Sequence, residues 1–322
     1  MSATKYFNEL LPERIHEAFA EAGITCQPAV RFLNSMENRV AKVFDEEEEP
    51  WVAKFYRPGR WSTQAIQEEH DFLYELQAAD LPVFPPIRLQ GGQTIGTVAN
   101  IYFAIFPFGY GRPPDELELS HVRILGELLA RVHEVGQRKP SKHRPYIAPD
   151  RWGAANLELL RRGGQVPENI WPRYERAATR LIERTSALFE EVEFQRLHGD
   201  CHRGNLLWSS QGPAFVDFDD TSMGPPVQDV WMLVPGRDND AIVLREALLE
   251  AYERRRPFDR KSLRLIEPLR GLRFIHYAAW LIARRDDPAI RRVFHDVGTR
   301  EYWRAELEDL EAQVERVEES VA

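Results

Sequence analysis

Apolar positions in the first hundred residues of the chain change between helical and strand-like spacing. Residues 6–21 carry apolar side chains every three or four positions, which predicts a helix that ends near Gly23. Strand-like runs follow, and helical spacing then returns: the predicted strands cover residues 29–33, 39–44 and 51–56, and the next helix covers residues 63–79. Two runs, TIGTV and IYFAIF, then predict a hairpin before the Pro/Gly-rich stretch PFGYGRPP.

Helical spacing dominates the rest of the chain. The predicted helices cover residues 119–135, 168–193, 239–255, 262–285 and 300–318. Strand-like composition interrupts them around FQRLHGD, NLLW and AFVDF. We therefore predict an α+β protein of two lobes, with a small β-rich N-lobe over residues 1–108 and a larger α-rich C-lobe over residues 109–322.

Composition and charge narrow the classes of partner. The chain has 322 residues, of which 43% are apolar and 29% are charged, as in ordinary globular proteins. Its net charge is −9 and its basic residues are scattered, so we expect no nucleic-acid partner. No apolar run approaches the roughly 20 residues that a bilayer span needs, so we expect no membrane partner. The charged N-terminal segment lacks the apolar core of a secretory signal, and two distant cysteines, Cys26 and Cys201, suit a reducing cytoplasm.

The strongest chemical signal is the segment LHGDCHRGNLLW. It places Asp200 and Asn205 five residues apart, and Gly199 and Gly204 permit sharp backbone turns. Asp217 follows at the end of AFVDF, and a hairpin would bring it near Asn205, where the two side chains offer the oxygen ligands that suit Mg²⁺. Asp200 would then orient an acceptor hydroxyl and take its proton. Either turn alone would suit an ordinary polar turn, but together they predict metal-assisted phosphoryl transfer.

A lysine inside a predicted strand supports this interpretation. In WVAKFY, Lys54 shares a strand face with Val52 and Tyr56. Alone, it would be a solvated or edge-strand charge. Glu69 follows on or beside the inward stripe of the next helix, ahead of the two aspartates. In that order, Lys54 is expected to reach the phosphates of ATP, and Glu69 is expected to hold it by an ion pair.

The groups that would surround the rest of ATP are less distinctive. The turn NSMEN, residues 34–38, lies where a phosphate-covering loop should be, but it has no Gly-x-Gly-x-x-Gly pattern. Ser35 could offer its hydroxyl and N–H as a small anion nest, with an ordinary turn as the equal alternative. The linker IFPFG would supply backbone groups for adenine, with Phe106 and Phe108 nearby, although such aromatics are more often core.

The segments LHGDCHRGNLLW and FVDFDD resemble those of the aminoglycoside phosphotransferase/choline kinase branch of the protein-kinase-like fold. LNSMENRV, VAKFYRPGRW and GPPVQDVWML extend the resemblance over nearly the whole chain, toward a bacterial subfamily of serine/threonine protein kinases. The resemblance implies the bilobal protein-kinase-like fold. It also implies phosphorylation of protein Ser/Thr hydroxyls with ATP and Mg²⁺, in the cytoplasm and in response to stress.

The resemblance also implies roles for individual residues. Asp200 would be the proton acceptor, Asn205 and Asp217 would bind Mg²⁺, and Ser35 would contact ATP. Asp229, in QDVW, would brace the catalytic loop by accepting backbone N–H bonds. No activation loop is recognisable between Asp217 and GPPVQD, so ordering of such a loop by phosphorylation is not expected.

Three polar residues near the loop are expected to be structural. Cys201 is expected to pack, with oxidant sensing as the alternative. Asp219 and Asp220 are turn carboxylates that need no function, with electrostatic tuning or a second ion as the alternative.

Three functions fit these patterns. The expected one is a monomeric, ATP- and Mg²⁺-dependent kinase of protein Ser/Thr hydroxyls, in which the protein acceptor is implied by the resemblance alone. A small-molecule kinase acting on an amino alcohol, a sugar or an aminoglycoside would use the same ATP groups, and an acidic chain would suit a cationic acceptor. A non-catalytic nucleotide-binding module is the third, although every expected catalytic group is present.

Overall fold

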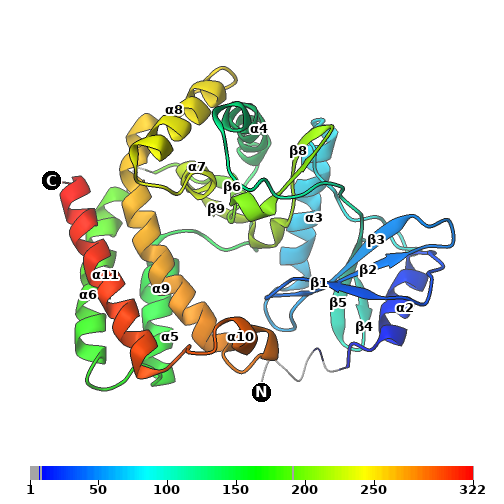
Figure 1. Cartoon of the computed structure of the whole chain (residues 1–322), viewed down its shortest axis with the longest axis horizontal. Coiled ribbons are helices and arrows are strands. Elements are labelled where there is room, and N and C mark those ends of the chain that lie inside the picture. Colours follow the sequence, from blue (N-terminus) through cyan, green and yellow to red (C-terminus); the bar gives the residue numbers. More distant parts are fainter. Residues whose placement is uncertain (1–6, 8, 191, 322) are drawn as a thin grey trace. The chain divides into compact units, whose positions relative to one another are not determined.

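The computed structural model describes residues 7, 9–190 and 192–321 and divides into two compact units (Figure 1). The first unit comprises Met1–Leu117, Ser141–Arg144 and His202–Asp220, and the second comprises Glu118–Pro140, Pro145–Cys201 and Thr221–Ala322. Two short segments from later in the chain therefore belong to the first unit. The lobe boundary between residues 108 and 109 stays a prediction.

A five-stranded antiparallel sheet forms the centre of the first unit. Its strand order is β1-β2-β3-β5-β4, built from β1 (Arg31–Leu33), β2 (Arg39–Phe44), β3 (Pro50–Phe55), β5 (Ile101–Pro107) and β4 (Gly96–Val98). The hairpin predicted from TIGTV and IYFAIF is β4 and β5, in which Val98 pairs with Ile101. β3 is the central strand, and its Lys54 pairs with Val40 on β2 and Ala104 on β5.

Each face of the sheet packs against a helix. Alternate residues of β3, such as Ala53 and Phe55, are buried in an apolar cluster with α2 (Pro12–Glu21) (Figure 1). Ala104, from the opposite face, is buried together with Ile66 of α3 (Thr63–Ala78). Ser62 caps α3 because its hydroxyl accepts the Ala65 N–H at 3.1 Å. The start predicted for the first helix at residues 6–8 falls partly outside the described residues.

The first unit also contains a short hairpin from later in the chain. Strands β7 (Leu206–Ser209) and β8 (Gly212–Phe215) pair antiparallel, as NLLW and AFVDF predict. The Phe215 N–H donates to the Pro82 carbonyl at 3.2 Å, and Arg112 and Trp208 exchange backbone hydrogen bonds at 3.2 and 2.9 Å. These bonds attach the hairpin to earlier parts of the same unit.

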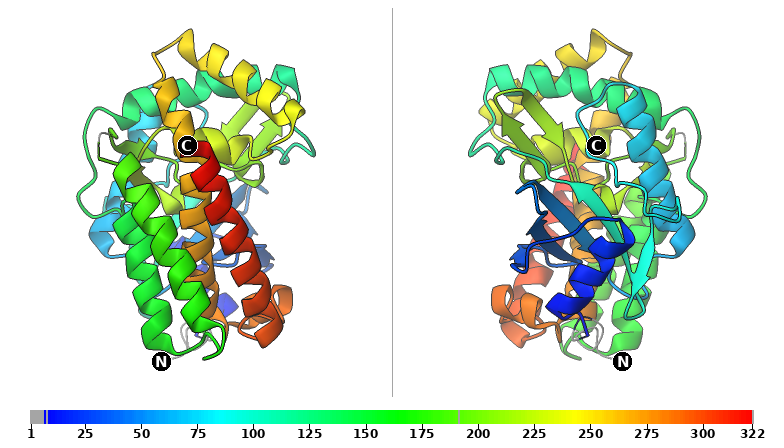
Figure 2. Two further views of the ribbon diagram at one scale, coloured as in Figure 1. Left: turned by 90° about the vertical axis from the view of Figure 1, so that its left-hand side faces the viewer. Right: turned by 90° about the vertical axis from the view of Figure 1, so that its right-hand side faces the viewer.

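The second unit is mainly helical, and three of its long helices, α6, α9 and α11, pack together. Its helices are α4 (Leu119–Gly136), α5 (Ala155–Gly163), α6 (Trp171–Leu188), α7 (Val227–Leu233), α8 (Asn239–Glu253), α9 (Ile266–Arg284), α10 (Pro288–Val293) and α11 (Arg300–Val321). Helices α6, α9 and α11 lie side by side around a core that includes Tyr174, Ile275 and Trp303 (Figure 2). Strands β6 (Gln195–Leu197) and β9 (Ser222–Gly224) pair in the same unit. None of the helices within the described ranges is long and apolar enough to span a bilayer.

Helix α4 packs closely against α8 and also holds strand β6. Helix α4 packs against α8 at Gly126, where a Cβ atom would collide with the Leu248 carbonyl. Near the end of α4, the Arg196 guanidinium of β6 donates to the Val135 carbonyl at 2.9 Å. The strand that leads into HGD is therefore fixed to a buried helix end, because a buried guanidinium requires such acceptors.

Candidate active site

Lys54 is a buried lysine on the central strand of the first unit. Its side chain is 9% exposed, and Nζ lies 3.1 Å from Glu69 Oε1, 3.1 Å from Asp219 Oδ1 and 3.3 Å from Asp217 Oδ1. A buried ammonium is tolerated only with such partners. The predicted ion pair with Glu69 is confirmed. The alternative of an edge-strand or solvated lysine is wrong, because β3 has neighbours on both sides.

Burial and charge act against each other in this cluster. Burial alone would lower the pKa of Lys54, but the facing carboxylates of Asp219, Glu69 and Asp217 raise it well above its ordinary value. Burial raises the pKa of Glu69, and Lys54 opposes that rise. For Asp219, burial would raise the pKa, but Lys54 and Arg60 outweigh it and hold it below the ordinary range. Lys54 therefore stays charged and carries fixed counter-ions.

Two arginines that the sequence patterns did not identify complete the cluster. Arg60 forms ion pairs with Asp219 and Asp220. The Arg144 guanidinium donates to the main-chain carbonyl of Asp219 and lies 4.2 Å from the Trp61 ring centre. Asp219, expected to be an ordinary turn carboxylate, is thus a buried counter-ion with a 4% exposed side chain. The run RPGRW, which follows Lys54 closely in the sequence, is the signal that could have identified Arg60.

Glu68 holds a distant segment of the first unit. Its carboxylate accepts the backbone N–H groups of Lys142, His143 and Arg144 at 2.7, 2.9 and 3.1 Å. Adjacent acids on α3 therefore have different partners: Glu69 binds a lysine, and Glu68 binds a loop. Glu68 positions the backbone from which Arg144 extends.

The turn at residues 34–38 is attached to the end of β3. Asn38 Oδ1 accepts the Arg57 N–H at 3.1 Å, and the Arg57 guanidinium donates to the carbonyls of Glu37 and Met36 at 3.0 and 3.1 Å. Ser35 is half-buried just before these residues. Its contact with ATP stays a prediction, but residues 36–38 of the turn are held by hydrogen bonds to Arg57.

The two linker phenylalanines have different surroundings. Phe106 pairs with Val52 across the sheet, and its ring meets His70 edge-on at 6.1 Å between centres. The Phe108 ring lies 3.8 Å from Lys42 Nζ. Phe106 therefore borders the core, and the contact of either ring with adenine stays a prediction.

The β7–β8 hairpin brings Asn205 and Asp217 together at their backbones. The Val216 N–H donates to the Asn205 carbonyl at 3.0 Å. Asp217 has a φ of 61°, in the left-handed region that is uncommon for residues other than glycine. Its side chain remains 55% exposed although Lys54 contacts one oxygen. An amide oxygen and an accessible carboxylate are the hard donors that suit Mg²⁺, so these residues fit the ion that the sequence implies.

In the second unit, Asp229 holds the turn that precedes Asp200. Its two carboxylate oxygens accept the N–H groups of His198 at 2.9 Å and Gly199 at 3.0 Å, as the resemblance implies. Gly199 has a φ of 86°, which a residue with a side chain rarely adopts. His133 Nε2 also lies 3.1 Å from Asp229, and burial lowers the pKa of His133 although Asp229 opposes this. A fully buried acid thus fixes the turn that precedes Asp200.

Asp200 has a cation beside it. Its Oδ1 lies 3.3 Å from a guanidinium nitrogen of Arg273 on α9, and the two side chains are 23% and 31% exposed. Sequence patterns did not identify Arg273, which lies 73 positions later in the chain. The neighbouring thiol of Cys201 is buried, and burial raises its pKa well above the ordinary value. That environment suits the expected packing role rather than a reactive thiolate.

Comparison with known proteins identifies the family. The model of the phosphotransferase enzyme family matches residues 29–266, and the chain belongs to this family. Stress response kinase A from Escherichia coli (strain K12) is 38% identical over 298 residues, which cover 92% of this chain and 90% of that protein. The serine/threonine protein kinase RdoA from Salmonella typhimurium (strain LT2) is 37% identical over the same length and the same shares.

Solved structures agree on the fold. Amicoumacin kinase hAmiN, in complex with AMP-PNP, Ca²⁺ and Ami, has a TM-score of 0.75 at 19% identity, covering 95% of this chain and 96% of that one. The microcompartment-associated aminopropanol kinase has a TM-score of 0.67 at 20% identity, covering 93% and 98%. The predicted α+β kinase-like fold is therefore confirmed.

Proposed function

We propose that this protein is an ATP- and Mg²⁺-dependent kinase that phosphorylates serine or threonine hydroxyls of proteins. The observation that carries the proposal is the buried Lys54–Glu69 ion pair beside Asp217. It is the arrangement that a protein-kinase-like enzyme uses to hold nucleotide phosphates. The names of the relatives from Escherichia coli and Salmonella typhimurium support a protein acceptor and a role in stress. A cytoplasmic location and action as a monomer belong to the same proposal.

Each predicted site residue has one role in the proposed mechanism. Lys54 would contact ATP phosphates, with Glu69 fixing its ammonium. Ser35 would contact ATP from the turn between β1 and β2. Asn205 and Asp217 would hold Mg²⁺, which when bound neutralises charge on the transferred phosphate. The carboxylate of Asp217 supports this assignment, because its side chain is 55% exposed although one of its oxygens lies 3.3 Å from Lys54 Nζ.

Asp200 would orient the acceptor hydroxyl and accept its proton. The N–H bonds from His198 and Gly199 to Asp229 fix the backbone just before it. Five positions along the chain separate Asp200 from Asn205, so one short loop carries both the base and a metal ligand. General-base catalysis of this kind contributes about 10²–10⁴-fold in rate.

A small-molecule kinase is the second candidate, because the solved structures of similar fold include an amicoumacin kinase and an aminopropanol kinase. The names of the relatives from Escherichia coli and Salmonella typhimurium support a protein acceptor rather than a small molecule. The ATP and metal groups would serve either acceptor. We therefore favour a protein acceptor.

The metal assignment has a direct test that uses two neighbouring acids. Labelled phosphate transferred from ATP would be measured against Mg²⁺ concentration in wild type, Asp217→Asn and the matched control Asp220→Asn. We expect Asp217→Asn to lose more than about 100-fold in transfer rate, as expected for removing a catalytic charge contact. Asp220, which pairs with Arg60, should be dispensable for metal dependence. Normal Mg²⁺-dependent transfer by Asp217→Asn would contradict the assignment.

A further inference from the structure

Helix α7 fixes the backbone of the turn before Asp200. Besides the N–H bonds of the turn to Asp229, the Gln228 side-chain amide donates to the Gly199 carbonyl at 3.2 Å. The Trp231 indole N–H donates to Gln228 Oε1 at 2.9 Å, so this amide is itself held. The bonds from α7 to the turn all end on main-chain atoms. They therefore do not set the torsions of the Asp200 side chain, which rotates about its own bonds.

A side chain from helix α9 contacts the Asp200 carboxylate. A guanidinium nitrogen of Arg273 lies 3.3 Å from Asp200 Oδ1, and Oδ1 is buried. The Asp200 side chain as a whole is still 23% exposed, so Oδ2 is the oxygen left for an acceptor hydroxyl. Arg273 thus contacts the buried oxygen of the carboxylate and leaves the other one for the reaction.

Helix α9 is fixed where it carries Arg273. Gly271 packs against Leu181 of α6, where an added Cβ atom would lie 2.7 Å from a methyl carbon. One position earlier, the Arg270 guanidinium donates to the Pro235 carbonyl at 2.8 Å, just after the end of α7. Helices α7 and α9 are therefore joined, and the guanidinium of Arg273 extends from a rigid backbone.

We propose that Arg273 is a positioning residue for phosphate transfer, which holds Oδ1 of Asp200 so that Oδ2 points at the acceptor hydroxyl. The proposal rests on the proposed function, in which Asp200 orients that hydroxyl and accepts its proton. Coulomb attraction at 3.3 Å favours the side-chain conformation in which Oδ1 faces the guanidinium. Oδ2 then takes the proton as the hydroxyl oxygen bonds to phosphorus, and the bond from phosphorus to the ADP oxygen breaks with its electron pair leaving on ADP.

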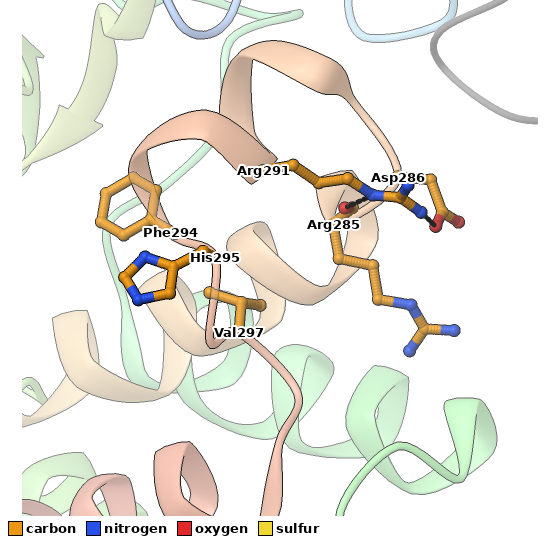
Figure 3. Close-up of a pocket in the computed structure, with 6 residues that line it drawn as sticks. All are labelled: Arg285, Asp286, Arg291, Phe294, His295 and Val297. Carbon is orange, nitrogen blue, oxygen red and sulfur yellow. Dashed lines mark hydrogen bonds and ion pairs between the residues drawn. The ribbon is translucent and has the colours of Figure 1, made fainter.

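Arg285 is a matched control for the loss of charge. It lies directly after α9, 12 positions beyond Arg273, and lines a pocket there (Figure 3). Figure 3 shows its guanidinium extending away from the ion pair that Arg291 and Asp286 form. Both arginines are half-buried, but of the two only Arg273 contacts Asp200 within the described residues.

The test is a double-mutant cycle on the full-length protein. The initial rate of phosphate transfer from labelled ATP to native cell-extract proteins would be measured against ATP concentration in the presence of Mg²⁺. The variants are Arg273→Gln, Arg273→Lys, Arg285→Gln, Asp200→Asn and the double variant Asp200→Asn/Arg273→Gln. Label on small molecules would be counted separately, and circular dichroism would check that each variant is folded.

We expect Arg273→Gln to lower kcat about 10- to 100-fold with little change in the KM for ATP, the size typical of a small misplacement of a catalytic group. Arg273→Lys keeps the cation and should recover part of the loss. Arg285→Gln should match wild type. In the Asp200→Asn background, Arg273→Gln should change kcat by less than about twofold, because the guanidinium acts only through the carboxylate.

Wild-type kcat in Arg273→Gln, or an equal loss in Arg285→Gln, would overturn the inference while leaving a kinase. An undiminished loss in the Asp200→Asn background would also overturn it, because Arg273 would then act independently of Asp200. Normal transfer by Asp200→Asn would overturn the proposed role of Asp200 and the inference together. Label only on small molecules would contradict the proposed protein acceptor, and the same comparison of kcat on that label would still decide the role of Arg273.

Discussion

Replacing Lys54 by methionine would test whether the charged cluster is a built counter-ion site. Methionine is unbranched and of similar length, so it fits the space on β3 but removes the charge. Glu69 and Asp219 would then be left with less compensation in a buried place, since their side chains are 1% and 4% exposed. The change should reduce both folding stability and phosphate transfer.

The distances give the size of the effect. At 3.1 Å and an effective dielectric constant of about 20, each contact of the ammonium with Glu69 or Asp219 corresponds to about 5 kcal/mol of Coulomb attraction. Desolvation of Lys54 offsets much of this, and breaking one partner of a buried pair typically costs about 3–5 kcal/mol. Asp219 keeps Arg60, and Arg144 remains 4.0 Å from Glu69. We therefore expect a loss of about 3 kcal/mol in the free energy of unfolding.

The loss should depend on pH in a defined direction. Burial already raises the pKa of Glu69 above 4.5, and removal of Lys54 should raise it further. A carboxyl with a raised folded-state pKa contributes stability that is fully present below its unfolded pKa and lost as the pH rises through its folded pKa. Lys54→Met should therefore be more destabilised at pH 8 than at pH 5.5.

Urea unfolding of wild type and Lys54→Met at both pH values, followed by circular dichroism, measures these differences. Lys42→Met is the matched control, because Lys42 lies on β2 against the Phe108 ring and outside the charged cluster. A loss below about 1 kcal/mol at pH 8, or a loss that grows as the pH falls, would refute the counter-ion argument.

Two further predictions concern α3. Glu68→Gln should weaken the charge-assisted bonds to residues 142–144 by about 1–3 kcal/mol in total, so trypsin should cleave faster after Lys142. The control Gln67→Ala changes a half-buried neighbour on α3 and should leave cleavage unchanged. Burial lowers the pKa of His70 to about 3, with its ring nitrogens bound to Tyr56 and Thr94 hydroxyls at 2.9 and 2.7 Å. Stability from the neutral ring is present above the unfolded value of 6.5 and lost as the pH falls toward 3, at up to about 1.4 kcal/mol per pH unit. His70→Gln should flatten this slope between pH 6.5 and 5 in urea unfolding, and an unchanged slope would mean that His70 does not supply it.

Much of the architecture follows from local patterns. Residues 39–44 form β2 as predicted, and the predicted helix at 63–79 is α3, which ends at Ala78. The short helices α5, α7 and α10 were not predicted, because a few turns give too little periodicity to separate them from loops. The helix predicted over 168–193 ends at Leu188, and residue 191 lies outside the described residues.

The residues of the charged site also divide into those that the sequence could predict and those that it could not. Lys54 and Glu69 could be predicted because each belongs to a regular element, whose period determines the face of its side chain. Arg144 and Arg273 could not, because each reaches its partner through tertiary packing between segments far apart in the chain. The burial of Asp219 was missed for the same reason: a carboxylate in FVDFDD reads as a turn until Arg60 and Lys54 are found beside it.

The most direct test of the central claim is transfer of labelled phosphate from ATP in the presence of Mg²⁺, comparing wild type with Asp200→Asn. Native cell-extract proteins would be the acceptor, and protein-bound label would be separated from label on small molecules. We predict label on protein Ser and Thr with wild type, and about 10²–10⁴-fold less with Asp200→Asn, which should still bind ATP. Equal labelling by the variant would remove Asp200 from the chemistry, and label only on small molecules would contradict the proposed protein acceptor.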